Sequence, residues 1–329
     1  MSDQRAFNKD VLNLDCEKET ARITNKLREL LKQELKRRGF VVAISGGIDS
    51  SVTATLCVRA VGKERVFTLQ MPEKHSASET AALSSTLAAH LGTETMLTNI
   101  SSILESVGFY EKYDAAVRSI IPEYGKGWKS KIVRPDIVRQ DTISFYSVVA
   151  QSPLGDIIKE RLPLKAYLEI LAATNFKQRI RKMLEYYHAD RLNYATTGTP
   201  NRLEYDQGFF VKLGDGAGDV KPIAHLYKTQ VFQLAEYLEI PDAIRNRPPT
   251  TDTYSLEQSQ DEFYFALPYD KMDLCLWAKN NHISEEETTS ATGLTVAQVQ
   301  RVFHDIDQKR ATTRYLHLPS LLIENVFHR

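Results

Sequence analysis

Apolar positions recur every three to four residues across residues 17–38, which predicts an amphipathic helix near the start of the chain. Gly39 ends this pattern, and the continuous apolar run Phe40-Val-Val-Ala-Ile44 follows it directly. An apolar run of this length, bounded by glycine, is typical of a strand that is buried on both faces of a parallel sheet. The first part of the chain therefore predicts a helix followed by a central strand.

The alternation between helix-like and strand-like patterns continues to residue 196. It predicts helices over residues 49–60, 76–91 and 176–188, and strands over residues 65–71, 95–100 and 192–196. Strands that alternate with helices in this way indicate an α/β fold with a doubly wound parallel sheet and flanking helices. We expect this α/β domain to span residues 1–268.

From Tyr269 onwards the pattern is helical, so we expect a C-terminal helical extension over residues 269–329. Two capping boxes, Ser284 with Glu287 and Thr295 with Gln298, predict two helix starts in this part of the chain. The resulting helix–glycine–helix pattern is superficially similar to a DNA-binding helix-turn-helix. A plain helical hairpin is favoured, because acidic residues offset the basic ones that phosphate binding would need.

Residues 121–164 interrupt the alternation, and we interpret them as an insertion whose structure the sequence does not assign. Connections longer than about 12–15 residues are typically lids or binding loops. The insertion carries a basic cluster of Lys126, Lys129, Lys131, Arg134 and Arg139. Contact with an anionic ligand and a solvated surface are both open explanations for that cluster, with the solvated surface favoured.

Composition and charge exclude several classes of protein. The 329 residues include 42 Lys and Arg and 42 Asp and Glu, and the resulting net charge of zero disfavours a general nucleic-acid or membrane-surface binder. Three cysteines without a C-x-x-C pair disfavour a disulfide framework, a Cys-rich zinc site and an Fe–S cluster. Residues 1–10 lack the apolar core of a signal peptide, and no apolar run approaches the roughly 18 residues of a membrane span. We expect a cytoplasmic protein.

The most informative motif is Ser45-Gly46-Gly47-Ile48-Asp49-Ser50, which follows the first apolar strand directly. The two glycines allow a sharp turn and a close approach of the backbone to a ligand. The N–H groups of the loop and of the next helix then point at one spot, which suits a phosphate group. Asp49 fits such a site where Mg²⁺ bridges it to the phosphate. An ordinary glycine-rich turn is the alternative, but the complete string favours nucleotide binding.

Further motifs follow in a fixed order. They are Asn175-Phe-Lys-Gln-Arg179-Ile-Arg181, Thr197-Gly198-Thr199 with Glu204, Gly208-Phe-Phe-Val-Lys212-Leu-Gly-Asp215-Gly216, and Leu226-Tyr-Lys228-Thr-Gln230. The loop resembles that of the ATP-pyrophosphatase group, whose members split ATP between the α- and β-phosphates. The later motifs are similar in order and spacing to those of ammonia-dependent NAD synthetases. This resemblance covers most of residues 20–320.

The resemblance implies an adenine nucleotide alpha-hydrolase-like fold, a homodimer, and the conversion of deamido-NAD, ATP and ammonia to NAD, AMP and pyrophosphate. It implies that ATP is bound by Ala43, Ile44, Ser45, Gly46, Gly47, Ile48, Asp49, Ser50, Thr199, Lys228 and Thr250. It implies that Mg²⁺ is held by Asp49 and Glu204, and that Lys212, Lys228 and Asp49 act in catalysis. It places deamido-NAD against Arg179, Lys212, Asp219, Arg314 and Tyr315.

Several features depart from that family pattern. Arg314-Tyr315 stands where many members have His-Lys, Thr199-Pro200-Asn201 replaces a T-D-H run, and residues 121–164 are additional. The role of Asp215 stays open. The segment before the motifs is too short for a glutaminase domain with its cysteine nucleophile, so we expect ammonia to enter directly or from a separate partner.

Two alternatives to NAD synthesis stay open. The insertion and Arg314-Tyr315 would also suit an amide ligase that adenylates another carboxylic acid. The helix–glycine–helix pattern would suit a nucleotide-binding regulator without turnover, although a sensor has no need for Asp49, Glu204 and two lysines together.

Overall fold

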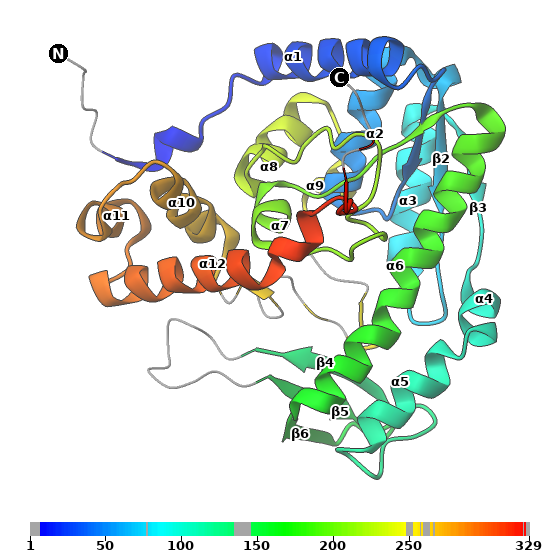
Figure 1. Cartoon of the computed structure of the whole chain (residues 1–329), viewed down its shortest axis with the longest axis vertical. Helices are drawn as coiled ribbons and strands as arrows, with labels where there is room; N and C mark the ends of the chain where they lie inside the picture. Colours follow the sequence, from blue (N-terminus) through cyan, green and yellow to red (C-terminus); the bar gives the residue numbers. More distant parts are fainter. Residues whose placement is uncertain are drawn as a thin grey trace.

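The computed structural model describes residues 7–76, 78–134, 146–247, 253–256, 258, 264–265, 267–324 and 326. Among these residues a parallel sheet of four strands lies at the centre, in the order β3-β2-β1-β7 (Figure 1). The strands are β1 (Phe40–Ala43), β2 (Val66–Gln70), β3 (Glu94–Leu97) and β7 (Ala195–Thr196). All four predicted strands are present, and each is shorter than the predicted range.

Side chains alternate between the two faces of the sheet, so each face has its own core. Phe40 and Val42 of β1 pack into a cluster with α1 (Cys16–Glu29), α2 (Ile48–Val61), α3 (Ser78–Leu91) and α8 (Lys228–Tyr237). Val41 points the other way, toward α4 (Ser101–Ser106), α5 (Phe109–Arg118) and α6 (Leu164–Leu192). Helices therefore cover both faces, and the predicted doubly wound α/β fold is confirmed.

Short helical segments complete this part of the chain. A π-helical turn (Leu30–Glu34) extends α1, 3-10 turns cover Lys9–Leu12 and Lys63–Arg65, and α9 spans Asp242–Arg245.

The predicted insertion contains a second, antiparallel sheet, which is built among the described residues from β4 (Lys129–Val133), β5 (Ser147–Gln151) and β6 (Ile157–Arg161). Ile132, Val148 and Ala150 are fully buried in the same cluster as Val41 of the central sheet. The small sheet is therefore packed into the main core. Arg139 lies outside the described residues.

Helix α6 begins at Leu164, whereas the sequence predicts a helix only from residue 176. Helix α6 packs against α5 and also contacts α4, β1 and β7. Ala166 and Ile170 in its first half are buried in the same cluster as residues of α5 and of the small sheet. A helix with different partners along its length has no single apolar stripe, so the periodicity detects only part of it. As Figure 1 shows, α6 runs diagonally from the small sheet to the central one.

The C-terminal part is helical, as predicted, with α10 (Tyr269–Asn280), α11 (Glu285–Thr292) and α12 (Val296–His317). Both predicted capping boxes form, at Ser284 and at Thr295. The core of these helices also holds Leu203 of α7 (Arg202–Gln207) and Tyr227. The domain boundary at residue 268 stays a prediction. None of the described helices combines the length and the apolar character that crossing a membrane requires.

Candidate active site

The Ser45–Ser50 loop joins β1 to α2 and presents its backbone to a large cavity. Gly46 has a φ of +72°, and a Cβ there would lie 2.9 Å from both Cβ of Leu83 and the carbonyl oxygen of Thr80. Only glycine fits that backbone without strain. The hydroxyl of Ser50 accepts from the Ser45 N–H at 3.2 Å and donates to the Gly47 carbonyl at 3.0 Å. These hydrogen bonds fix the shape of the loop at the N-terminus of α2, where the free N–H groups favour binding of an anion.

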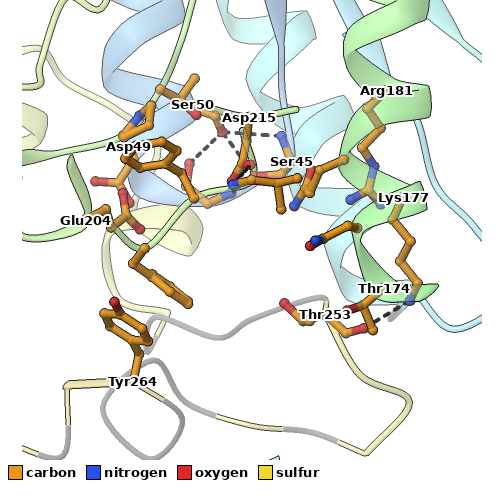
Figure 2. Close-up of a pocket in the computed structure, with 18 of the residues that line it drawn as sticks. Ser45, Asp49, Ser50, Thr174, Lys177, Arg181, Glu204, Asp215, Thr253 and Tyr264 are labelled. Atoms are coloured by element: carbon orange, nitrogen blue, oxygen red, sulfur yellow. Dashed lines mark hydrogen bonds between the residues drawn. The ribbon is translucent and has the colours of Figure 1, made fainter. Parts of the chain in front are cut away.

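Asp49 and Glu204 lie beside each other next to the loop (Figure 2). The buried Lys228 interacts electrostatically with both carboxylates. Lys228, the first residue of α8, forms an ion pair with Asp49 and is only 2% exposed. Asn201 donates to Oδ1 of Asp49 at 3.0 Å, and its backbone N–H donates to the Glu204 carboxylate at 3.1 Å. The same asparagine thus caps α7 and positions both carboxylates.

The electrostatics of this cluster follow from burial and like charge. Burial, together with the charge of Asp49, raises the pKa of Glu204 to about 8 against the opposing effect of Lys228. Burial alone would lower the pKa of Lys228, but Asp49 and Glu204 outweigh burial and raise it. Two carboxylates therefore face one permanently charged lysine.

This donor set fits a magnesium ion that is bound together with a nucleotide. Among the residues that the structure describes, no group of three or more His, Cys, Asp or Glu side chains could hold a metal ion. Mg²⁺ commonly binds one or two carboxylates and takes its remaining ligands from phosphate and water. Burial first, and the nearby charge of Asp49 second, raise the pKa of Glu204, and a divalent cation beside the two carboxylates would stabilise their charged forms. Asp49 and Glu204 suit that arrangement.

Helix α6 adds further cations to the cavity wall, on the side opposite Asp49 and Glu204 (Figure 2). Lys177 is 2% exposed and pairs with Glu73 at 2.6 Å. Lys182 pairs with Glu185 at 2.6 Å and donates to the carbonyl of Thr197. Sequence reasoning did not single out these lysines, because their buried partners come from the tertiary structure or lie on the hidden face of α6.

The cavity has a volume of about 1100 Å³ and extends well beyond the loop. Its walls include most of the predicted site residues: Ala43 to Ser50, Arg179, Thr199, Glu204, Lys212, Lys228 and Tyr315. A site for a drug-sized ligand occupies about 300–1,000 Å³. One continuous cavity therefore has room for a nucleotide together with a second ligand.

Lys212 is anchored to the end of the C-terminal helix. Its Nζ donates to the carbonyl oxygens of Tyr315 at 2.7 Å and Leu318 at 3.0 Å. The side chain of Arg179 donates in turn to the Lys212 carbonyl at 3.3 Å. These contacts bring three of the five predicted deamido-NAD residues together at one part of the cavity: Arg179, Lys212 and Tyr315.

The structure places the remaining predicted residues elsewhere. Asp219 and Arg314 are described but do not line the cavity, and the Asp219 carboxylate accepts from the backbone N–H of Thr196 at 2.7 Å. Thr250 lies outside the described residues. Asp215, whose role the sequence leaves open, accepts from the backbone N–H of Val211 at 2.8 Å, and burial raises its pKa.

A glycine-rich loop with free N–H groups after the first strand of a parallel sheet, with a carboxylate pair and a buried lysine beside it, is typical of a nucleotide-binding α/β enzyme. The family model for NAD synthase matches residues 19–121 and 146–314. The chain belongs to the NAD synthase family, whose members are ligases that form a C–N bond. The match leaves out residues 122–145, which lie inside the insertion.

Relatives from three bacteria support that assignment. The chain is 55% identical to the NH(3)-dependent NAD(+) synthetase of Rhizobium meliloti, over 97% of this chain and 96% of the relative. It is 54% identical to the enzyme of the same name from Mesorhizobium japonicum, over 95% of this chain and 98% of that one. A third enzyme of this name, from Thermotoga maritima, is 35% identical over 78% of this chain and 85% of its own length.

Solved structures share the fold at low sequence identity. The NMN synthetase from Francisella tularensis superimposes with a TM-score of 0.64 at 20% identity, covering 96% of this chain and all of the other. The NH3-dependent NAD synthetase from Campylobacter jejuni gives 0.61 at 22% identity, covering 94% of this chain and all of the other.

Proposed function

We propose that this chain is an ammonia-dependent NAD synthetase, which amidates deamido-NAD and cleaves ATP to AMP and pyrophosphate. The observation that carries the proposal is the convergence of Asp49, Glu204 and Lys228 beside a phosphate-binding loop, within one cavity that has room for two substrates. The 54–55% identical relatives of that name, aligned over nearly the whole chain, support the same activity.

In the first step an oxygen of the nicotinate carboxylate attacks the α-phosphorus of ATP. The bond between the α-phosphorus and the oxygen that bridges it to the β-phosphate breaks, and pyrophosphate leaves. The loop N–H groups and the hydroxyl of Ser45 bind phosphate oxygens. The ammonium group of Lys228 stabilises the negative charge that develops around the α-phosphate, because it is buried and fixed by Asp49. A Mg²⁺ ion held by Asp49 and Glu204 would supply further neutralisation of the triphosphate.

In the second step ammonia attacks the acyl carbon of the adenylate. The C–O bond to AMP breaks, AMP leaves, and the new amide nitrogen gives up a proton. Arg179 and Lys212 hold the acid substrate, since they lie together on the cavity wall and carry positive charge. The carbonyl oxygens at the end of α12 keep Lys212 in place while this exchange occurs.

A homodimer belongs to the same proposal. Helix α6 exposes several large apolar side chains, among them Leu168, Met183 and Tyr187, which a second subunit would cover. Light scattering at micromolar concentration tests the assembly, and a monomeric mass would contradict it. The cytoplasmic location stays a prediction.

The direct test is pyrophosphate release with ATP, Mg²⁺ and ammonium, measured with and without deamido-NAD. We expect release that depends on deamido-NAD, yields NAD, and falls sharply in Lys212→Ala and Asp49→Asn. Lys159→Ala is the matched control, because Lys159 is exposed on β6 and does not line the cavity.

ATP hydrolysis that another carboxylic acid stimulates, and deamido-NAD does not, would contradict the proposal and favour a different amide ligase. Tight ATP binding without any release of pyrophosphate would favour a regulator instead.

A further inference from the structure

The insertion and the C-terminal helix meet at the cavity wall that faces the phosphate loop. Arg134 directly follows β4, and its Nη2 lies 2.6 Å from Oδ1 of Asp305 on α12. The two side chains are 15% and 3% exposed, and both line the cavity. An exposed basic cluster, the explanation that the sequence favours, therefore does not describe Arg134.

Lys309 completes a buried group of three charges. Its Nζ lies 2.8 Å from Oδ2 of Asp305 and donates to the carbonyl oxygen of Tyr264 at 2.8 Å. Figure 2 shows Tyr264 below Asp49 and Glu204, on the same side of the pocket and opposite Lys177 and Arg181. The group of Arg134, Asp305 and Lys309, here called the far cluster, shares no residue with the loop.

The far cluster has a surplus of positive charge. It contains two cations and one carboxylate, which gives a net charge of +1 at a buried place. Burial lowers the pKa of Lys309 to about 8, and the charge of Arg134 contributes to this lowering against the effect of Asp305. A buried surplus charge is unfavourable until a counter-ion arrives. An anion bound from the cavity would relieve it.

Aromatic rings line the same part of the cavity. Tyr146 stacks on Tyr167 with their ring centres 4.7 Å apart, and Phe209 stacks on Tyr264 at 4.6 Å. All four residues line the cavity together with Arg134 and Lys309. Cations beside flat apolar surfaces suit a ligand that combines phosphate with aromatic bases, which describes a nucleotide.

We propose that Arg134 and Lys309 form a phosphate subsite for the dinucleotide substrate, separate from the loop that holds ATP. This inference rests on the proposed function. The reacting carboxylate of the dinucleotide must point toward ATP at the loop, so its phosphates extend away from the loop along the cavity. A guanidinium carries five N–H donors, so Arg134 can hold Asp305 and also bind a phosphate oxygen. Arg134 belongs to residues 122–145, which the family model leaves out, so the subsite is a contribution of the insertion.

The test compares Arg134→Gln with wild type in steady-state kinetics and in calorimetric binding of deamido-NAD without ATP. Loss of a charge-assisted hydrogen bond predicts a rise of about tenfold to a hundredfold in both KM and Kd for deamido-NAD. The KM for ATP should stay within about twofold, since the loop is untouched. Arg161→Gln is the matched control, because Arg161 is exposed on β6 of the same sheet and does not line the cavity.

The triple variant Arg134→Gln/Asp305→Asn/Lys309→Met separates substrate binding from a structural role. It removes both cations together with the carboxylate that they share, so no buried charge of the far cluster is left without a partner, and it also gives an answer if the single variant folds poorly. If Arg134 and Lys309 bind the substrate, the triple variant keeps the raised Kd. A Kd that returns to the wild-type value would overturn the proposal, as would a rise confined to the KM for ATP. Failure of the proposed function is seen separately, as a wild-type protein that makes no NAD from deamido-NAD.

Discussion

Replacing Lys228 with methionine tests the centre of the proposed mechanism. Methionine keeps the length and approximate volume of the side chain, so little empty space forms in the core around α8. The substitution removes the cation that pairs with Asp49 and interacts electrostatically with Glu204. Two effects should follow, one on stability and one on the rate.

The stability effect follows from burial. Breaking a buried ion pair by removal of one partner costs about 3–5 kcal/mol. The side chain of Asp49 is 16% exposed, so water can solvate part of the abandoned charge. We therefore expect a loss near the low end of that range, about 3 kcal/mol, measured by urea unfolding at neutral pH.

The expected effect on kcat follows from the negative charge that develops around the α-phosphate in the transition state. Loss of one preorganised group that faces developing negative charge lowers kcat by about a hundredfold to a thousandfold. We expect that loss in pyrophosphate release at saturating substrates, with an equal loss in kcat/KM for ATP. The control is Lys221→Met, because Lys221 is a half-buried lysine over the ring of Tyr205 that does not line the cavity. A folded Lys228→Met variant with kcat within about threefold of wild type would refute the role in catalysis.

Three further substitutions probe the geometry of the site. Asn201→Ala removes the cap of α7 and a hydrogen-bond donor to Asp49, so we expect the free energy of unfolding to fall by about 1–2 kcal/mol. Titrations of activity should also show a higher Mg²⁺ requirement. An unchanged Mg²⁺ requirement would contradict the positioning role. Asp273 caps the start of α8, and burial raises its pKa from 3.8 to about 7, so the native state holds its proton more tightly and loses stability as pH rises between those values. Denaturation from pH 4 to 7 should show a smaller pH dependence for Asp273→Asn, and equal slopes would refute this. Gly46→Ala forces a methyl group against Leu83 at a positive φ, so we expect the free energy of unfolding to fall by more than about 1 kcal/mol. Calorimetry should also show weaker ATP binding, and wild-type ATP affinity would contradict the reasoning.

The sequence predicts the central sheet and the phosphate loop because their signals are local. A strand that is buried on both faces needs a continuous apolar run, and Phe40-Val-Val-Ala-Ile44 is such a run. The loop needs small residues and a positive φ, and Gly46 supplies both. Capping boxes are equally local, which explains why those at Ser284 and Thr295 form as predicted.

Local signals fail where one element has several partners. The periodicity does not detect the first half of α6, because this helix packs against α5 as well as against β1 and β7 of the central sheet. The sequence does not assign the strands of the insertion, because their buried residues, such as Ile132 and Val148, pack into a core formed by distant segments.

The α/β alternation, the loop and the family motifs can be predicted from the sequence, because each depends on residues within a few positions of one another. Which charged side chains pair with each other depends on the tertiary structure. Lys228 reaches Asp49 across 179 positions of the chain, and Arg134 reaches Asp305 across 171. Contacts at that separation leave no periodicity in the sequence, and only the packing of helices around the sheet brings the partners together.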